Sequence, residues 1–318
     1  MKSRIPIALA ALSLIGGGVF RSEAGVAAYQ AAVQATPDLV SYYKFDDGTA
    51  NDNFGTNNGT LLGTAGFATG FGGGPDQALN LDGSGYDSLG GGAALISIPA
   101  LTFASTTNGT VEMWAQAGWT DLTPSVFYAM VSSTAYSMNY NILMTGDKSA
   151  LVFWSDTAWQ TFSILAPGTN WHHLAVAIAP AGTNCTCTVI WDGVSLGTQV
   201  APWASGPNNT VQLGTPQWNG STYGAAGNWI GKLDEVAFYS THLPVSSIQA
   251  HYAATTGPMI HIAPSGANVA ISWSAFGNWV LESAPQLPAV RWTAVQTNGS
   301  PATISISGGN NFFRLRAQ

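Results

Sequence analysis

Acidic and amide side chains gather in one loop near residue 50 and again in a pair near residue 235. The loop, from residue 46 to residue 60, is dense in Asp, Asn and Gly. The pair, Asp234-Glu235, interrupts an apolar stretch typical of a strand. Calcium takes about six to eight oxygen ligands from carboxylates and carbonyls, and a loop facing the pair could supply them. The alternative is that these are ordinary turn residues and a surface charge pair, since Asp and Asn are common turn formers.

Aromatic residues form the second group of candidates. The chain has 12 Trp and 10 Tyr, and their flat apolar faces with a polar rim suit stacking against sugar rings. Some of them lie in stretches rich in Gly, Asn, Thr and Pro, where burial is less expected than on a strand. For each, the alternative is that it caps an edge of the fold. These candidate ligand-binding residues are Trp119, Trp159, Trp203, Trp218 and Tyr223.

The first 24 residues predict a secretory signal. Lys2 and Arg4 precede an apolar run, and Ser22-Glu23-Ala24 has the small-x-small pattern of a cleavage site. The run is shorter than the ~20 residues of a spanning helix, so we expect no membrane span. Removal of the signal leaves 6 basic and 15 acidic residues, a net charge of −9. This charge disfavours nucleic acid and anionic membrane as partners, and we expect an extracellular or cell-surface protein.

Two short motifs invite a metal or redox interpretation. Cys185 and Cys187 lie two apart on a predicted strand, so both should point to one face, and we expect a free, buried pair. His172 and His173 are adjacent on a predicted strand and should point to opposite faces, so they cannot readily share one metal ion. A structural role is expected for both pairs.

Short apolar strands separated by turn residues run along the chain, which predicts an all-β sandwich. Characteristic segments follow in a consistent order: TVEMWAQ at 110–116, NWHHLAVAI at 170–178, an Asp192-Gly193 hairpin turn, and GKLDEVAFY at 231–239 before a short helix. Over residues 38–254 this order resembles the LamG-like (concanavalin A-like lectin/glucanase) jelly-roll family. The resemblance implies a jelly-roll sandwich of two antiparallel sheets.

Five segments are predicted along the chain. They are a signal peptide at 1–24, an Ala-rich leader at 25–37 that is either helical or mobile, the jelly roll at 38–254, a linker at 255–258 and a small fibronectin-like β-module at 259–318. The fold is expected to begin at Pro37-Asp38. The last segment, with NVAISW, VLES, WTAV and FFRL, resembles a C-terminal module of secreted proteins from verrucomicrobial and planctomycete-type bacteria, which implies a bacterial source.

The family resemblance also implies a structural calcium ion between a D-x-S-G-N loop and the acid of the D-E-V strand. On this chain those positions are Asp52 and Asp234, with Asp46 or Asp47 as further ligands. The loop departs from the family pattern, because the segment 54–57 (FGTN) replaces S-G-N.

A secreted, non-catalytic, lectin-like protein that binds an extracellular polysaccharide or glycan is the predicted function. The related glucanases use two carboxylates about 5–9 Å apart, and their E-x-D-x-x-E or E-x-D-x-E strand is missing from this sequence. Glu112 lies in a VEMW segment that the family uses without catalysis. The alternatives are a structural or adhesive extracellular protein that contacts other proteins, and a polysaccharide-cleaving enzyme. The sequence leaves the oligomeric state open.

Overall fold

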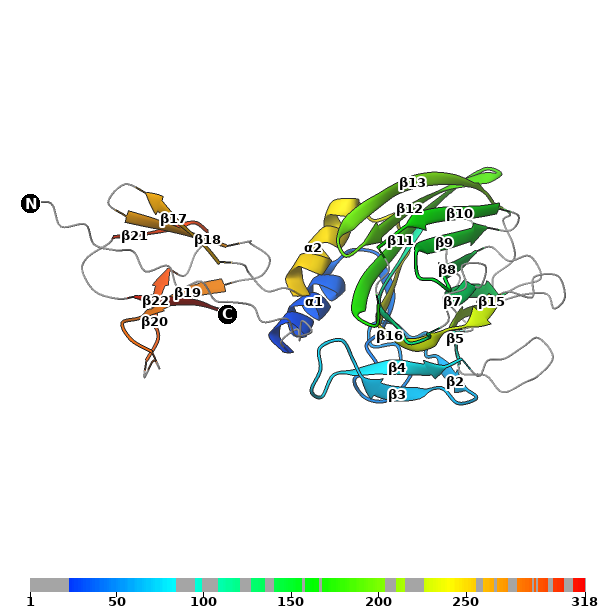
Figure 1. Ribbon diagram of the computed structural model, residues 1–318, viewed down its shortest axis with the longest axis horizontal. Coiled ribbons are helices and arrows are strands. Elements are labelled where there is room, and N and C mark those ends of the chain that lie inside the picture. Colours follow the sequence, from blue (N-terminus) through cyan, green and yellow to red (C-terminus); the bar gives the residue numbers. More distant parts are fainter. Residues whose placement is uncertain are drawn as a thin grey trace, which may run out of the picture.

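The computed structural model of the protein describes residues 23–83, 95–98, 108–120, 127–134, 140–155, 158–165, 168–203, 210–214, 226–255, 260–265, 268–273, 279–287, 289, 291–296, 300–305 and 311–317. Strands dominate these residues, and two large sheets face each other across one core (Figure 1). Nearly all strand pairs are antiparallel. The predicted all-β sandwich is therefore confirmed.

Sheet A is centred on one long strand, β16 (Ile230–Tyr239), which pairs with β6 on one side and with β4 and β1 on the other. Along the sheet the order is β13 (Val194–Pro202), β12 (Asn184–Trp191), β11 (Trp171–Ala181), β6 (Gly109–Ala117), β16, β4 (Gln77–Asp82) and β3 (Gly66–Thr69), with β1 (Leu39–Tyr43) also on β16. Strand β16, which carries the pair Asp234-Glu235, therefore connects β1 and β4, from the first part of the chain, to β6, from its middle.

Sheet B packs against the inner face of sheet A. Its order is β10 (Ala158–Ser163), β9 (Ala150–Ser155), β8 (Asn141–Thr145), β7 (Phe127–Thr134), β14 (Thr210–Leu213), β5 (Leu95–Ile98) and β2 (Thr60–Leu62), with β15 (Ala226–Asn228) parallel to β7. Alternate residues of β11, such as Leu174 and Val176, face the core between the sheets, and Ala175 faces outward. Cys185 and Cys187 are buried in this core as free cysteines.

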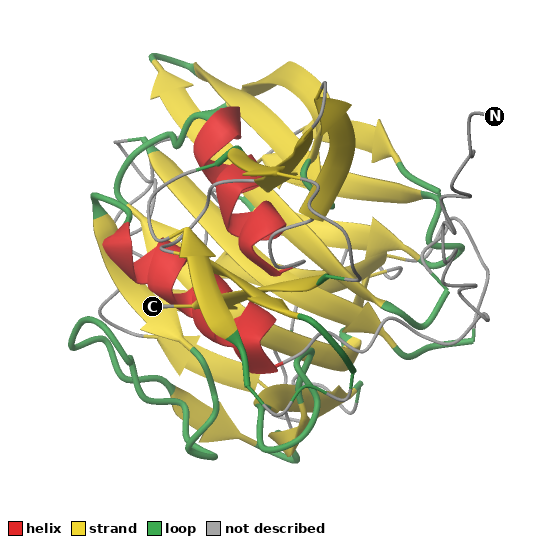
Figure 2. Cartoon of the chain, turned by 90° about the vertical axis from the view of Figure 1, so that its left-hand side faces the viewer, coloured by secondary structure: helices red, strands yellow, loops and turns green. Residues whose placement is uncertain are grey.

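Two helices cover the outer face of sheet A. They are α1 (Glu23–Ala35) and α2 (Val245–Thr255), which lie together on the strands in Figure 2. Beneath them Phe71 stacks on Trp114 with ring centroids 4.6 Å apart, and Tyr252 of α2 stacks on the same indole at 5.9 Å. This second core explains why Trp114 is fully buried although it points away from sheet B.

Helix α1 is an integral part of the fold. The side chains of Tyr29 and Val33 are completely buried between the helix and sheet A. The Ala-rich leader is therefore helical, which was one of the two expected alternatives. The folded part of the chain begins before Pro37-Asp38, where the sequence had predicted its start.

The last strands form two smaller sheets with a separate core built around Ile271, Trp273 and Leu281. In one sheet the order is β17 (Ile260–Ser265), β18 (Asn268–Trp273) and β21 (Ala302–Ser305), and in the other β20 (Thr293–Gln296), β19 (Trp279–Ala284) and β22 (Phe312–Ala317). Within the described part of the chain, neither helix has the length and apolar character needed to cross a membrane.

Candidate functional site

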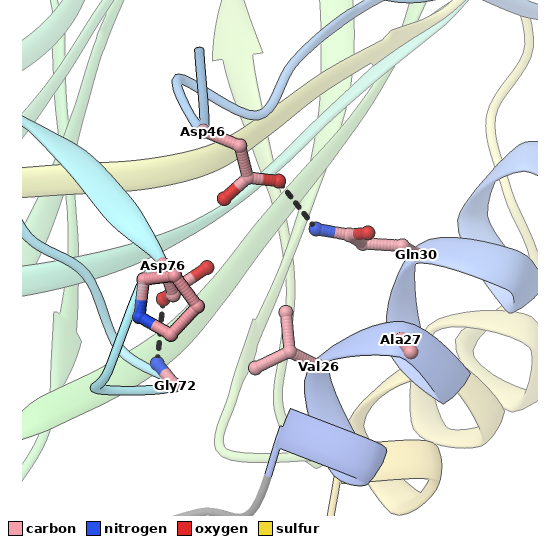
Figure 3. A pocket seen from close by; sticks show the side chains of 7 residues that line it. Val26, Ala27, Gln30, Asp46, Gly72 and Asp76 are labelled. Carbon is pink, nitrogen blue, oxygen red and sulfur yellow. Dashed lines mark hydrogen bonds between the residues drawn. The ribbon is translucent and has the colours of Figure 1, made fainter. Parts of the chain in front are cut away.

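Four carboxylates, from Asp46, Asp76, Asp234 and Glu235, meet beside α1; we call them the acid cluster. One carboxylate oxygen from each of Asp46, Asp76 and Glu235 lies within 4.8 Å of the others. A pocket of about 340 Å³ opens between α1 and the turn at residues 70–76, and Asp46 and Asp76 line it (Figure 3). The cluster is therefore open to solvent through this pocket.

A β-bulge in β16 places Asp234 and Glu235 on the same side of sheet A. Consecutive residues of a regular strand point to opposite faces. Here the pairing of β16 with β6 shifts just after Asp234, and Glu235 has a φ of 52°. In this left-handed conformation Glu235 accepts hydrogen bonds from the Tyr42 hydroxyl and from Gln30 Nε2 of α1. Bulges re-aim side chains in this way next to functional sites.

Asp76 is positioned by a tight turn before β4. The amide N of Gly72 donates to Asp76 Oδ2 at 2.7 Å, and the amide N of Gly70 donates to the backbone O of Asp76 at 2.8 Å. A Cβ at position 70 would overlap Asp76 Oδ2 and would lie 2.5 Å from Asp234 Oδ2, so only glycine fits between the two carboxylates. Asp76 is 7% exposed, and its buried Oδ1 has no hydrogen-bond partner among the described residues.

Little positive charge compensates the acid cluster. Within the described residues the basic side chain paired with it is Lys44, whose Nζ lies 3.7 Å from Asp46. Burial, with the nearby charge of Asp46, raises the pKa of Asp76 to about 7. Burial and the charge of Asp76 raise the pKa of Asp234 well above its usual range, and burial alone does the same for Glu235. An oxygen-only donor set with uncompensated charge and an unpartnered buried oxygen fits a hard divalent cation such as calcium.

The structure brings together two of the four aspartates that the sequence predicted as metal ligands, Asp46 and Asp234. Asp47 instead organises its own turn, where its Oδ1 accepts hydrogen bonds from the amide N and hydroxyl of Thr49 at 3.0 and 2.7 Å. Asp52 organises the loop of residues 52–57. Its carboxylate accepts four hydrogen bonds, from the amide N atoms of Tyr42, Phe54, Gly55 and Asn57.

Asp76 and the convergence of Glu235 on the same site were not predicted from the sequence. Asp76 follows a Gly-rich stretch, FGGGPD, that is typical of a turn. The one available signal for Glu235 was that an acidic pair sat in an apolar strand without an apparent reason.

The second candidate site is aromatic and lies on the outer face of sheet B. Trp159 of β10 is 37% exposed and stacks on Phe127, with ring centroids 4.8 Å apart. Trp154 lies directly across from Trp159 on β9, at a centroid distance of 4.1 Å. We call these three residues the aromatic platform. Asn141 of β8 pairs with Trp154 on the same face, but both side chains are buried, so Trp159 is the exposed ring of this group.

The other predicted aromatic residues are not placed on that face. Trp119 is 4% exposed, stacks on Tyr128 at 4.1 Å and donates from Nε1 to the backbone O of Gly146 at 2.8 Å. Trp203 is 5% exposed and packs in the core between the sheets. Their ring faces are occupied by protein. Trp218 and Tyr223 lie outside the described residues.

Glu112, a carboxylate that could suggest catalysis, is buried beneath the helices. It accepts hydrogen bonds from His173 Nε2 at 2.8 Å, His251 Nδ1 at 2.9 Å, the Tyr29 hydroxyl at 3.2 Å and the Tyr239 hydroxyl at 3.3 Å. Burial opposes ionisation, but the two histidines outweigh it and lower the pKa of Glu112 to about 2. These contacts tie α1, α2 and sheet A together, which is a structural role for Glu112 and His173.

The two facing, mostly antiparallel sheets form a concanavalin A-like jelly-roll sandwich. A sequence model described as the concanavalin A-like lectin/glucanases superfamily matches residues 90–249. The chain belongs to this superfamily, and the predicted resemblance is confirmed. No curated protein sequence matches the chain.

Several solved structures have a similar fold. Domain 4 of the extracellular arabinanase AbnA from Geobacillus stearothermophilus, in complex with arabinotriose, matches 68% of this chain and 98% of its own with a TM-score of 0.51 and 20% identity. The botulinum neurotoxin serotype D/C binding domain matches 81% of this chain and 69% of its own, with a TM-score of 0.52 and 13% identity. A botulinum neurotoxin type C structure, described as dependent on two ganglioside molecules for cell entry, matches 90% and 72%, with a TM-score of 0.51 and 13% identity. Similarity at this level of identity shows the shared fold.

Proposed function

We propose that the protein is a secreted, non-catalytic binding protein that holds an extracellular polysaccharide or glycan on the outer face of sheet B. The observation that carries this proposal is the exposed indole of Trp159, held in place by Phe127 and Trp154. A braced aromatic ring loses little conformational freedom on binding and offers a flat apolar surface to a sugar ring. The outer face of sheet A is filled by α1 and α2, whereas Trp159 leaves part of its ring exposed on the outer face of sheet B.

The comparisons support a glycan as the ligand class. The arabinanase domain was solved with arabinotriose, and the type C neurotoxin structure is described by its interaction with gangliosides. A non-catalytic role is supported by the complete burial of Glu112, because the catalytic carboxylates of a glycosidase must reach the substrate.

We also propose that the acid cluster holds a structural calcium ion, with Asp46, Asp76 and Glu235 as ligands and Asp234 behind them. The buried, unpartnered Oδ1 of Asp76 supports this proposal most directly, because such an atom is costly unless something binds it. A bound cation would offset the repulsion among carboxylates that lie within 4.8 Å of one another. It would hold the β16 bulge and the turn before β4 in place.

Retention on immobilised polysaccharides tests the glycan proposal. We expect the protein to be retained by at least one member of a panel that includes arabinan. We expect Trp159→Ala to weaken that binding about tenfold or more, since loss of ring stacking removes on the order of 1.4 kcal/mol. The control is Phe54→Ala, because Phe54 is 50% exposed but lies in the loop after β1, away from the platform.

Other outcomes would favour the alternatives. Retention that survives Trp159→Ala would place the ligand elsewhere on the molecule. Lack of retention on every polysaccharide, with self-association or capture of a partner protein, would support the structural or adhesive alternative, and the exposed Val194 and Val200 of edge strand β13 would then be the first surface to vary. Release of new reducing ends would show an enzyme.

A further inference from the structure

A glutamine from α1 lies in the middle of the acid cluster. Gln30 Nε2 donates to Asp46 Oδ2 at 3.1 Å and to Glu235 Oε1 at 2.6 Å (Figure 3 shows the first of these). Gln30 Oε1 accepts a hydrogen bond from Lys44 Nζ at 3.4 Å. The amide group therefore bridges two of the carboxylates with its donor end, at the place where a cation would neutralise them.

Both ends of this amide group can serve the cluster. A glutamine side chain carries two N–H donors and one carbonyl acceptor, and a half-turn about its last bond exchanges them. Amide carbonyl oxygens are among the ligands that calcium accepts. We propose that Gln30 supplies one ligand oxygen to the cation site, so that cation binding fastens α1 to sheet A. This inference rests on the calcium ion proposed above.

The count of ligands supports a contribution from α1. Asp46, Asp76 and Glu235 supply one oxygen each. Calcium takes about six to eight oxygen ligands, so further ligands are needed. Gln30 is a neutral oxygen donor already in contact with two of these residues. The pocket lined by Val26 and Ala27 gives the ion a path to the cluster and leaves room for water ligands.

The cation would join parts of the chain that are far apart in sequence. Gln30, Asp46 and Asp76 all precede residues 90–249, the segment that the superfamily model matches, and Glu235 lies within it. Helix α1 also fits closely against α2, since a Cβ on Gly25 would overlap the backbone O of Thr255. A cation that binds only when α1 is docked on sheet A raises the equilibrium constant for docking by a factor of about 1 + [calcium]/Kd. Helix docking and cation affinity are therefore linked.

Calcium affinity of the full-length protein, measured by titration calorimetry with calcium chloride, is the first test. We expect Gln30→Leu to weaken binding about tenfold or more, the range seen when groups that support a metal site are removed. The matched control is Gln34→Leu, an exposed glutamine one turn further along α1 and outside the pocket, which should leave the affinity unchanged. Gln30→Glu retains an oxygen donor and should bind at least as tightly as the wild type.

Hydrogen exchange of the α1 amides is the second test. At a calcium concentration of about 100 times Kd, exchange from the docked helix should slow about 100-fold in the wild type and in Gln34→Leu, and far less in Gln30→Leu. A Gln30→Leu variant that folds and binds calcium as tightly as the wild type, or more tightly, would overturn the inference. That result is expected if Gln30 only hydrogen-bonds the carboxylates and competes with the ion. If the wild type itself binds no calcium, the cation proposal fails, and this inference fails with it.

Discussion

Replacing Asp76 by Asn should have opposite effects with and without calcium. Asn keeps an oxygen that can accept the hydrogen bond from the amide N of Gly72, so the turn before β4 should persist. The change removes one negative charge from a site where one carboxylate oxygen each of Asp46, Asp76 and Glu235 lies within 4.8 Å of the others. It also removes one charged ligand of the proposed ion. The calcium-free protein should therefore become more stable, and the stabilisation by calcium should largely disappear.

The distances set the size of both effects. Two unit charges at that separation repel by about 3 kcal/mol in a medium of effective dielectric constant about 20. The pocket admits solvent and the carboxylates can share protons, so we expect a gain of about 1–3 kcal/mol in the calcium-free variant. For a domain of this size each kcal/mol moves the melting temperature by about 2–4 °C. Calcium at about 100 times Kd should stabilise the wild type by about 2.7 kcal/mol and the variant by less than about 1 kcal/mol.

Thermal melts of the wild type and of Asp76→Asn, each in chelator and in millimolar calcium, give the four melting temperatures to be compared. The control is Asp47→Asn, because Asp47 lies one residue from Asp46 but binds Thr49 rather than the cluster. We expect this control to keep the full calcium-dependent shift. The reasoning would be refuted if Asp76→Asn melted lower than the wild type in chelator and still showed an unchanged shift with calcium.

Three further predictions concern other parts of the same structure. Gly70→Ala should destabilise the protein by about 1–3 kcal/mol in urea unfolding, because its Cβ overlaps Asp76 Oδ2, whereas Gly66→Ala on neighbouring β3 meets nothing within 4 Å and should be nearly neutral. Glu112 has a folded-state pKa of about 2, below its unfolded value, so its ionised form stabilises the fold above about pH 4.5. The wild type should lose about 3 kcal/mol from this group as the pH falls from about 4.5 to 2, and Glu112→Gln should lack that part of the decline. Chelation at a temperature well below the melt should not change the Trp159-dependent retention on polysaccharide, because the platform is on sheet B and the acid cluster borders sheet A. A loss of retention in the folded protein would contradict this separation.

Much of the sandwich could be predicted from the sequence because its strands carry strong local signals. The Asp192-Gly193 turn predicts a hairpin, and the structure pairs β12 with β13 around it. The alternation in β11 separates residues that face sheet B from those that face the helices. Helix α1 was harder to predict, because an Ala-rich segment fits a helix or a mobile leader equally well. Its burial depends on Tyr29 and Val33 meeting a surface that forms from distant strands.

The metal ligands could be predicted only in part, because a bulge and a turn decide which carboxylates converge. A strict period of two puts Asp234 and Glu235 on opposite faces, and the left-handed backbone at Glu235 reverses that outcome. Asp52 looks like a ligand in the sequence, but its oxygens are used by four backbone amides. A carboxylate that organises a loop and one that binds a cation have the same sequence signature.

Which of the candidate aromatic residues are exposed could also not be predicted from the sequence. Trp119 and Trp203 follow the ends of strands, where a loop residue is free to fold back over the core, and both do so. Trp159 was expected in a loop and lies on β10, the edge strand of sheet B, where exposed residues alternate with more buried ones. Trp159 is held in place there by Trp154 on β9 and by Phe127 on β7, yet its ring remains partly exposed. The helices cover the outer face of sheet A, and the acid cluster lies beside them. The proposed calcium site, which would stabilise the sandwich, and the surface proposed to bind the glycan therefore lie on different sheets.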